Sequence, residues 1–119
     1  MTRPGDLWVL GKRHRLVCDD ARRADYQRLM RGERAGMVFT DLPYNLDLRK
    51  VVGRGRIKHG NFAMASGEMS RPEFTTFLEE AIGPASENSF DGALCYFCMD
   101  WRHQREILDA GVKVFGGGC

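Results

Sequence analysis

The 119-residue sequence contains no long apolar run, no hydrophobic leader and almost no excess of one charge, since its formal net charge is +2. A helix that crosses a bilayer needs about 20 apolar residues, and a signal peptide needs an apolar core that residues 1–8 lack. We therefore expect neither a membrane protein nor a secreted protein. With 43% hydrophobic and 29% charged residues, the composition is typical of a soluble globular domain.

Cysteine is scarce, with four residues, and only Cys95 and Cys98 have the C-x-x-C spacing of metal or redox sites. These two residues lie in an apolar run that predicts a buried strand, where positions i and i+3 point to opposite faces. No second C-x-x-C pair and no paired histidine follows them. We interpret them as small core residues without a metal, in a reduced, cytoplasmic protein.

Acidic residues are missing from residues 48–67, which contain five Lys or Arg residues. A long loop inside a compact domain is usually functional, and this charge favours contact with phosphate groups over a merely solvated loop. The candidate DNA-binding residues are Arg49, Lys50, Arg54, Arg56 and Lys58.

Turn signals and short apolar runs divide the first half of the chain. Residues 7–18 predict a β-hairpin around a turn at residues 11–14. The two aspartates at 19–20 can cap a helix that Gly32 would end. A strand over residues 37–40 follows this helix.

The second half begins with a capping box at residues 70–73, ahead of apolar residues at helical spacing. We expect the Gly-Pro pair at 83–84 to end or kink this helix. A buried strand over 92–99, a helix over 100–110 and a third strand over 112–115 are expected next. The apolar face of the first of these helices consists of Phe74, Phe77, Leu78, Ala81 and Ile82, and the first three of these are expected in the core.

The alternation of strands and helices is the pattern of a parallel α/β sheet. Such sheets bind ligands beyond the carboxyl ends of their strands. Residues 41–44 and 100–103 both follow predicted strands, so we expect them to line one site. Four further side chains have alternative interpretations. Asp100 is a helix cap or a site residue. Trp101 can stack on a ligand, but packing in the fold is favoured, and His59 and His103 are interpreted as surface or structural groups.

The segment Asp41-Leu42-Pro43-Tyr44 combines a carboxylate, a stiff turn and an aromatic ring. A carboxylate can accept a hydrogen bond from an exocyclic amine, and the turn can present a backbone carbonyl as a second acceptor. The ring can stack on a flat base. Enzymes that modify a base extrude it into a pocket of this kind, so these residue types in this order favour nucleobase chemistry.

Residues 38–45, VFTDLPYN, resemble the signature [D/N/S]-P-P-[Y/F/W] of the DNA amino-methyltransferases, which follows a hydrophobic strand. Leu42 replaces the first proline, so the turn is less rigid, but Leu42 keeps the backbone carbonyl that the family uses. Residues 18–21, CDDA, are similar to the family's C-G-D-[A/S] segment. Residues 5–8 and 99–103 resemble a subgroup in which the methylase often follows a ParB-like nuclease domain.

The resemblance implies a partial Rossmann-like, S-adenosylmethionine-dependent methyltransferase fold. It implies that Asp41 and the Leu42 carbonyl accept hydrogen bonds from the amine of a flipped base. Pro43 would hold the turn and Tyr44 would stack on the base, and no metal is needed. Asp20 is implied for cofactor binding, and double-stranded DNA is the implied partner, with adenine N6 favoured over cytosine N4 as the target.

The family's cofactor loop, F-x-G-x-G at a strand–helix turn, has no equivalent in residues 1–119. Residues 115–118, FGGG, come too early for the family's beta arrangement, and no helix is expected after them. The resemblance therefore covers the N-terminal portion of a methylase domain, about half of its sheet, without the target-recognition region. We expect the chain alone to be inactive and unstable, because apolar sheet faces would stay uncovered. The alternatives are a nucleic-acid-binding remnant without catalysis, and one half of a split enzyme completed by a second polypeptide.

Overall fold

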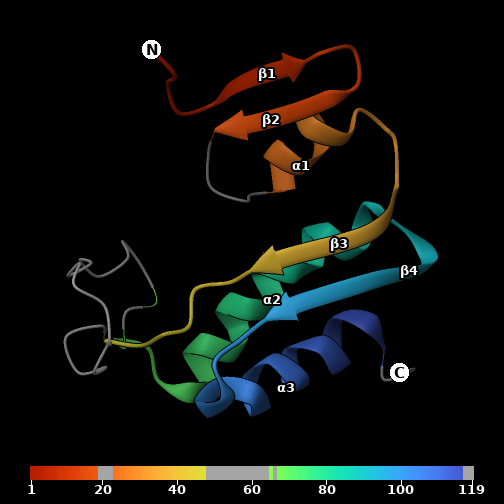
Figure 1. The fold of residues 1–119 in the computed structure, drawn as a ribbon. Coiled ribbons are helices and arrows are strands. Elements are labelled where there is room, and N and C mark those ends of the chain that lie inside the picture. The colour runs from red at the N-terminus through yellow and green to blue at the C-terminus, as the bar shows by residue number, and fades with distance from the viewer. Residues whose placement is uncertain (19–22, 48–64, 66, 117–119) are drawn as a thin grey trace. The chain divides into compact units, whose positions relative to one another are not determined.

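The computed structural model describes residues 1–18, 23–47, 65 and 67–116 (Figure 1). The strands in these ranges are β1 (Asp6–Leu10), β2 (His14–Cys18), β3 (Ala35–Asp41) and β4 (Ser89–Cys98). The helices are α1 (Arg23–Met30), α2 (Arg71–Glu87) and α3 (Gln104–Phe115), and a 3₁₀ turn, η1 (Trp101–His103), precedes α3.

These elements confirm a mixed α/β class. The strands form two separate two-stranded sheets, β1–β2 and β3–β4. The chain divides into two compact units, residues 1–38 with 81–95 and residues 39–80 with 96–119. None of the helices among the described residues is long and apolar enough to cross a membrane.

The first unit begins with the β1–β2 hairpin, as the apolar runs predict. The two strands are antiparallel, and Gly11 has a positive φ of 61° in the turn between them. Arg15 on β2 donates to the Met30 carbonyl at 3.3 Å. Arg28 on α1 donates to the Gly5 carbonyl at 2.6 Å. These two bonds tie α1 to both ends of the hairpin.

Strands β3 and β4 pair with each other and run in the same direction (Figure 1), with α2 as the connection between them. This strand–helix–strand unit is the part of the predicted parallel pattern that the structure confirms. Helix α2 starts at the predicted capping box, where Glu73 accepts bonds from the Ser70 hydroxyl at 2.6 Å and the Ser70 N–H at 2.8 Å. These bonds lower the pKa of Glu73.

Helix α2 continues beyond Pro84, so the end expected at the Gly-Pro pair is wrong. A proline inside a helix removes one backbone hydrogen bond, but Ile82, Pro84 and Ala85 are all buried, and their packing holds this turn. The Asn88 side chain then donates to the Pro84 carbonyl at 2.8 Å, and the Ser89 hydroxyl donates to the Ala85 carbonyl at 2.7 Å. The last turn of α2 therefore has partners for two of its free carbonyls.

Helix α3 extends over the residues expected to form a third strand, so that strand is wrong. The reason is that Ile107, Ala110, Gly111 and Val114 are buried or half-buried at helical spacing. Of the two valines that suggest a strand, Val114 therefore continues the apolar pattern of a helix, and Val112 is exposed. Gly116 ends α3 with a positive φ of 75°.

The core of the second unit includes Phe74 and Leu78, which are completely buried. The His103 ring lies edge-on to Phe74 at 5.0 Å, and its Nδ1 is 3.2 Å from Glu106 Oε1. Burial alone would raise the pKa of the Glu106 carboxyl, but bonds from its own N–H and from His103, with the charge of Arg71 3.6 Å away, hold this pKa below its ordinary value. The buried carboxylate joins the starts of α2 and α3, and His103 is a structural group, as predicted.

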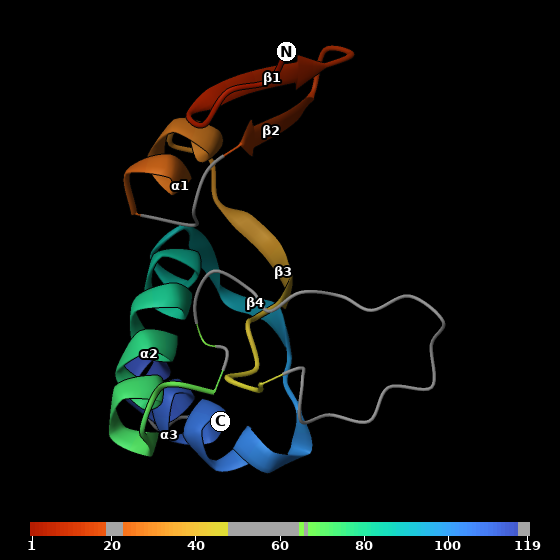
Figure 2. The same cartoon turned by 90° about the vertical axis from the view of Figure 1, so that its left-hand side faces the viewer.

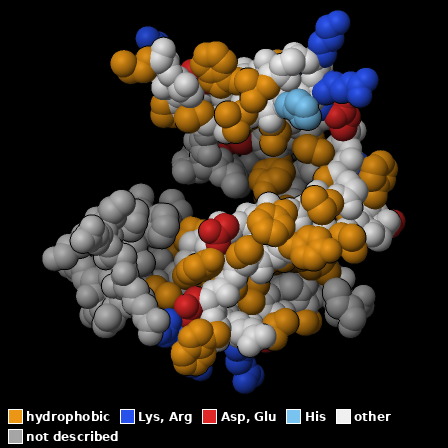
Figure 3. Space-filling model, viewed as in Figure 1, with side chains coloured by type: hydrophobic (Ala, Val, Ile, Leu, Met, Phe, Trp, Pro, Cys, Tyr) orange, Lys and Arg blue, Asp and Glu red, His pale blue; other side chains and the backbone are white. Residues whose placement is uncertain are grey.

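Among the residues that the structure describes, helices cover one side of strands β3 and β4. In the second unit, α3 and the first half of α2 lie on the same side of the two strands (Figure 2). The strand expected over residues 92–99 is present as part of β4. Its expected burial is wrong, because exposed Phe90, Leu94 and Tyr96 alternate with more buried residues. Cys95 and Cys98 are free and half-buried, not core residues. Hydrophobic side chains gather over these strands (Figure 3).

We predict that this apolar sheet face makes the chain self-associate. Phe39 on β3 and Tyr96 on β4 are 70% and 50% exposed, with ring centroids 6.3 Å apart. Burial of such apolar surface between two copies of the chain stabilises their association by about 25 cal/mol per Å². The double variant Phe39→Ser/Tyr96→Ser should therefore shift the chain toward monomer in sedimentation velocity.

The matched control is Leu108→Ser/Val112→Ser, which removes two apolar side chains of α3 that are 61% and 60% exposed. This control should associate as the wild type does. A wild-type chain that sediments as a monomer and unfolds in one cooperative transition would contradict the prediction.

Candidate active site at the end of β3

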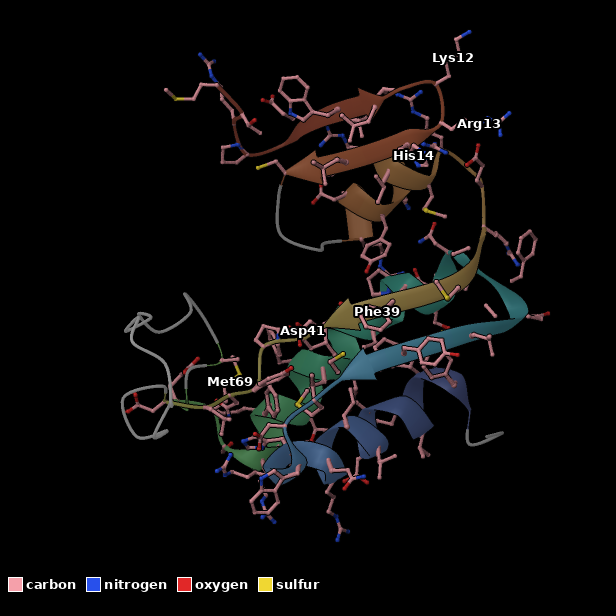
Figure 4. All side chains as sticks on the ribbon, in the orientation of Figure 1. Lys12, Arg13, His14, Phe39, Asp41 and Met69 are labelled. Atoms are coloured by element: carbon pink, nitrogen blue, oxygen red, sulfur yellow. The ribbon has the colours of Figure 1, made fainter. Side chains whose placement is uncertain are left out.

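Strand β3 places Asp41 at its carboxyl end, as the sequence predicts (Figure 4). Asp41 is exposed, and the Leu42 and Pro43 that follow it are half-buried. Pro43 has no backbone N–H and cannot extend a strand ladder, so the chain leaves the sheet at this point. Residues 41–44 are named here the Asp41–Tyr44 turn.

Within this turn, the Tyr44 hydroxyl donates a hydrogen bond to Asp41 Oδ1 at 2.5 Å. This bond, together with partial burial and electrostatic interactions with Asp41, Cys98 and Asp100, raises the pKa of Tyr44 to about 12. Tyr44 is therefore a neutral donor at physiological pH. The Asp41 carboxylate thus already accepts a hydrogen bond of the kind that an exocyclic amine would donate.

Asn45 fixes the path of the chain after the turn. Its side chain is buried, with 5% exposure, and its φ is positive at 49°. Its Nδ2 donates to the Met69 carbonyl at 2.8 Å, and its Oδ1 accepts from the N–H groups of Gly67 and Met69 at 3.1 and 3.2 Å. Sequence reasoning gave Asn45 no role, although asparagine is one of the few residues that adopt a left-handed conformation readily.

Gly67 permits a close approach in the same place. Its φ is 92°, and a Cβ on this residue would lie 2.9 Å from the backbone nitrogen of Asp47. Glycine alone accepts both the conformation and the contact. Asn45 and Gly67 therefore hold residues 45–47 against residues 67–69, directly after the Asp41–Tyr44 turn.

Cys98, at the end of β4, and Asp100, which follows it, both act electrostatically on Tyr44 and raise its pKa. Asp100 caps η1 by accepting from the Arg102 N–H at 3.0 Å, which confirms its predicted role as a cap. Trp101 is 76% exposed, with the Arg102 guanidinium 5.0 Å from its ring centroid, so the expectation that Trp101 packs in the fold is wrong. The two predicted site segments therefore lie within electrostatic range of each other. The Trp101 indole of the second segment is in solvent.

Several predicted site residues lie outside the described part of the chain. The site that the structure describes is therefore the Asp41–Tyr44 turn, its supports and the end of β4. The residues outside it are Asp20, implied for cofactor binding, the DNA-binding candidates Arg49, Lys50, Arg54, Arg56 and Lys58, and His59.

Comparison of the chain with protein-family models, curated proteins and solved structures finds no match. The chemistry of the site is therefore inferred from its residues. They are an exposed carboxylate, a neutral hydroxyl bonded to it, and an asparagine and a glycine that hold the turn in place.

We predict that Tyr44 titrates near pH 12 and not at its ordinary pKa of 10.0. The pKa of Tyr44 should fall toward 10 in Asp41→Asn, which removes the charge beside it. Because the folded pKa lies above the unfolded value, the bond stabilises the fold fully below pH 10, and this contribution disappears as pH rises through 12. Tyrosinate absorbance measures the titration, and Tyr44→Phe identifies the Tyr44 component. An equal pKa of Tyr44 in the wild type and Asp41→Asn would refute the assignment.

Proposed function

We propose that the chain forms the target-base pocket of an S-adenosylmethionine-dependent DNA amino-methyltransferase of partial Rossmann-like fold. The observation that supports this most directly is the Asp41–Tyr44 turn, where an exposed carboxylate at a strand end accepts a bond from a neutral donor. Ligands of parallel α/β sheets bind beyond the carboxyl ends of the strands. The β3–α2–β4 unit is consistent with the beginning of such a sheet.

In this proposal, the amine of a flipped base displaces the Tyr44 hydroxyl from Asp41. One amine N–H donates to the Asp41 carboxylate and the other to the Leu42 carbonyl. These two acceptors favour a tetrahedral nitrogen, whose lone pair is then available for attack. The Tyr44 ring, released from Asp41, stacks on the base and fixes its plane.

The acceptor groups fit this chemistry, because an amine donates two hydrogen bonds and the turn offers a carboxylate and a carbonyl to accept them. The cofactor supplies an electrophilic methyl group, and the resemblance assigns its contact to Asp20. The contribution of the described residues is to hold the amine in line for attack, which is a positioning effect. Adenine N6 remains the favoured target, with cytosine N4 as the other exocyclic amine.

Transfer of a labelled methyl group to duplex DNA tests the proposal. The chain is assayed alone and together with the polypeptide that its gene region encodes next, using S-adenosylmethionine labelled in the methyl group. We expect transfer by the combined preparation and little or none by the chain alone. No transfer by either preparation would contradict the proposal.

A further inference from the structure

A hollow beside the turn of the β1–β2 hairpin is lined mainly by basic side chains. It encloses about 420 Å³. Its residues belong to the first unit, whereas the Asp41–Tyr44 turn belongs to the second. The lining residues are Val9, Lys12, Arg13, Arg15, Arg31 and Glu33.

Most of the positive charge in this hollow is uncompensated. Arg15 pairs with Glu33, and the Arg15 side chain is only 16% exposed. The side chains of Lys12, Arg13 and Arg31 form no ion pair or hydrogen bond with any residue that the structure describes. Four cations and one carboxylate line the hollow, so the balance is 4 − 1 = +3. Like charges held together repel each other, and an anion in the hollow would relieve this repulsion.

The hairpin turn and the segment after α1 carry these cations. Lys12 and Arg13 lie in the turn between β1 and β2, and Figure 4 shows both side chains extending away from the strands. Arg31 directly follows α1. The Arg15–Glu33 pair joins β2 to the segment after α1, so the turn and Arg31 stay on the two sides of one hollow.

We propose that this hollow binds the phosphate backbone of a nucleic-acid duplex. Arginine and lysine are the side chains that recognise phosphate, as a bidentate fork and as a point charge respectively. A concave surface suits the ridge of a duplex backbone better than it suits a flat bilayer. The contact is separate from the base pocket, so it does not depend on methyl transfer.

Anisotropy of a labelled DNA duplex, measured over a series of salt concentrations, tests this proposal. The slope of log affinity against log salt changes by about 0.9 for each phosphate contact. The variant Lys12→Gln/Arg13→Gln should therefore reduce the slope by about 1.8, from two lost contacts. Cations that are not substituted, including those of residues 48–67, contribute equally to the salt slope of every variant.

The matched control is Arg105→Gln/Lys113→Gln, which removes two cations from α3 and gives the same net charge. This control should keep the wild-type slope. Circular dichroism verifies that both variants fold, and Arg31→Gln, outside the hairpin turn, should independently reduce the slope by about 0.9. The readout is the salt slope of duplex binding and not methyl transfer, which separates this site from the proposed reaction.

Two results would overturn the proposal. An equal reduction of the salt slope in Lys12→Gln/Arg13→Gln and in the α3 control would show that net charge alone governs binding. Binding to vesicles containing phosphatidylserine, with the same dependence on Lys12 and Arg13 but without duplex binding, would show that the partner is a membrane surface.

Discussion

Methyl transfer should fall by about 10³-fold when Asp41 is replaced with alanine, the loss typical of removing one oriented polar group from an active site. The carboxylate is the acceptor that fixes the target amine, and the Leu42 carbonyl alone leaves the nitrogen free to rotate. Asp41→Asn should lose less activity, because an amide oxygen still accepts a hydrogen bond but carries no charge. The measurement is single-turnover transfer to duplex DNA by the preparation that is active with wild-type chain.

The controls for this prediction separate the carboxylate from its neighbours. Asp91→Ala removes an exposed carboxylate of β4 and should leave the rate unchanged. Tyr44→Phe removes the hydroxyl that bonds Asp41 but keeps the ring, so it should cost far less than Tyr44→Ala. Undiminished transfer by Asp41→Ala would show that the turn is not the site of reaction.

Asn45→Ala should lower the free energy of unfolding by about 3 kcal/mol, because buried groups lose their partners and alanine disfavours a positive φ. The Asn45 side chain makes three hydrogen bonds to the backbone of Gly67 and Met69. Asn45→Gly loses the same bonds but accepts the positive φ, so it should be the milder of the two variants. Urea denaturation measures both.

Asn88→Ala is the matched control for Asn45→Ala. Asn88 is half-buried, and its side chain makes one hydrogen bond, to the Pro84 carbonyl, so its loss should cost about 1 kcal/mol. Equal costs for Asn45→Ala and Asn88→Ala would contradict the role of Asn45 as the main support of the turn.

Local patterns were sufficient to predict the elements whose signals lie within a few residues. Three features were predicted, because turns, caps and proline act over short distances. They are the hairpin of β1 and β2, the capping box of α2 and the strand ending at Asp41. The end of α2 was not, since the burial of Pro84 depends on packing with distant residues. The same applies to α3, where valines were interpreted as a strand and instead form part of a helix.

The candidate site also combines features set by local sequence with features set by distant residues. The position of Asp41 and Tyr44 in a turn at the end of a strand could be predicted, because strand and turn signals are local. Asn45 acts through partners more than 20 residues away, so its role could not. The exposure of the apolar face of β3 and β4 could not be predicted from the sequence of β4 alone. An apolar run shows that a strand can be buried on both faces, but whether a second layer covers it depends on the rest of the fold.

The identity of the methylated base tests the central claim most directly. DNA treated with the active preparation is digested to nucleosides and analysed by mass spectrometry. The account predicts N6-methyladenine, or N4-methylcytosine, because Asp41 and the Leu42 carbonyl act on an exocyclic amine. A methyl group on a ring carbon such as C5 of cytosine, or no methylated nucleoside at all, would contradict it.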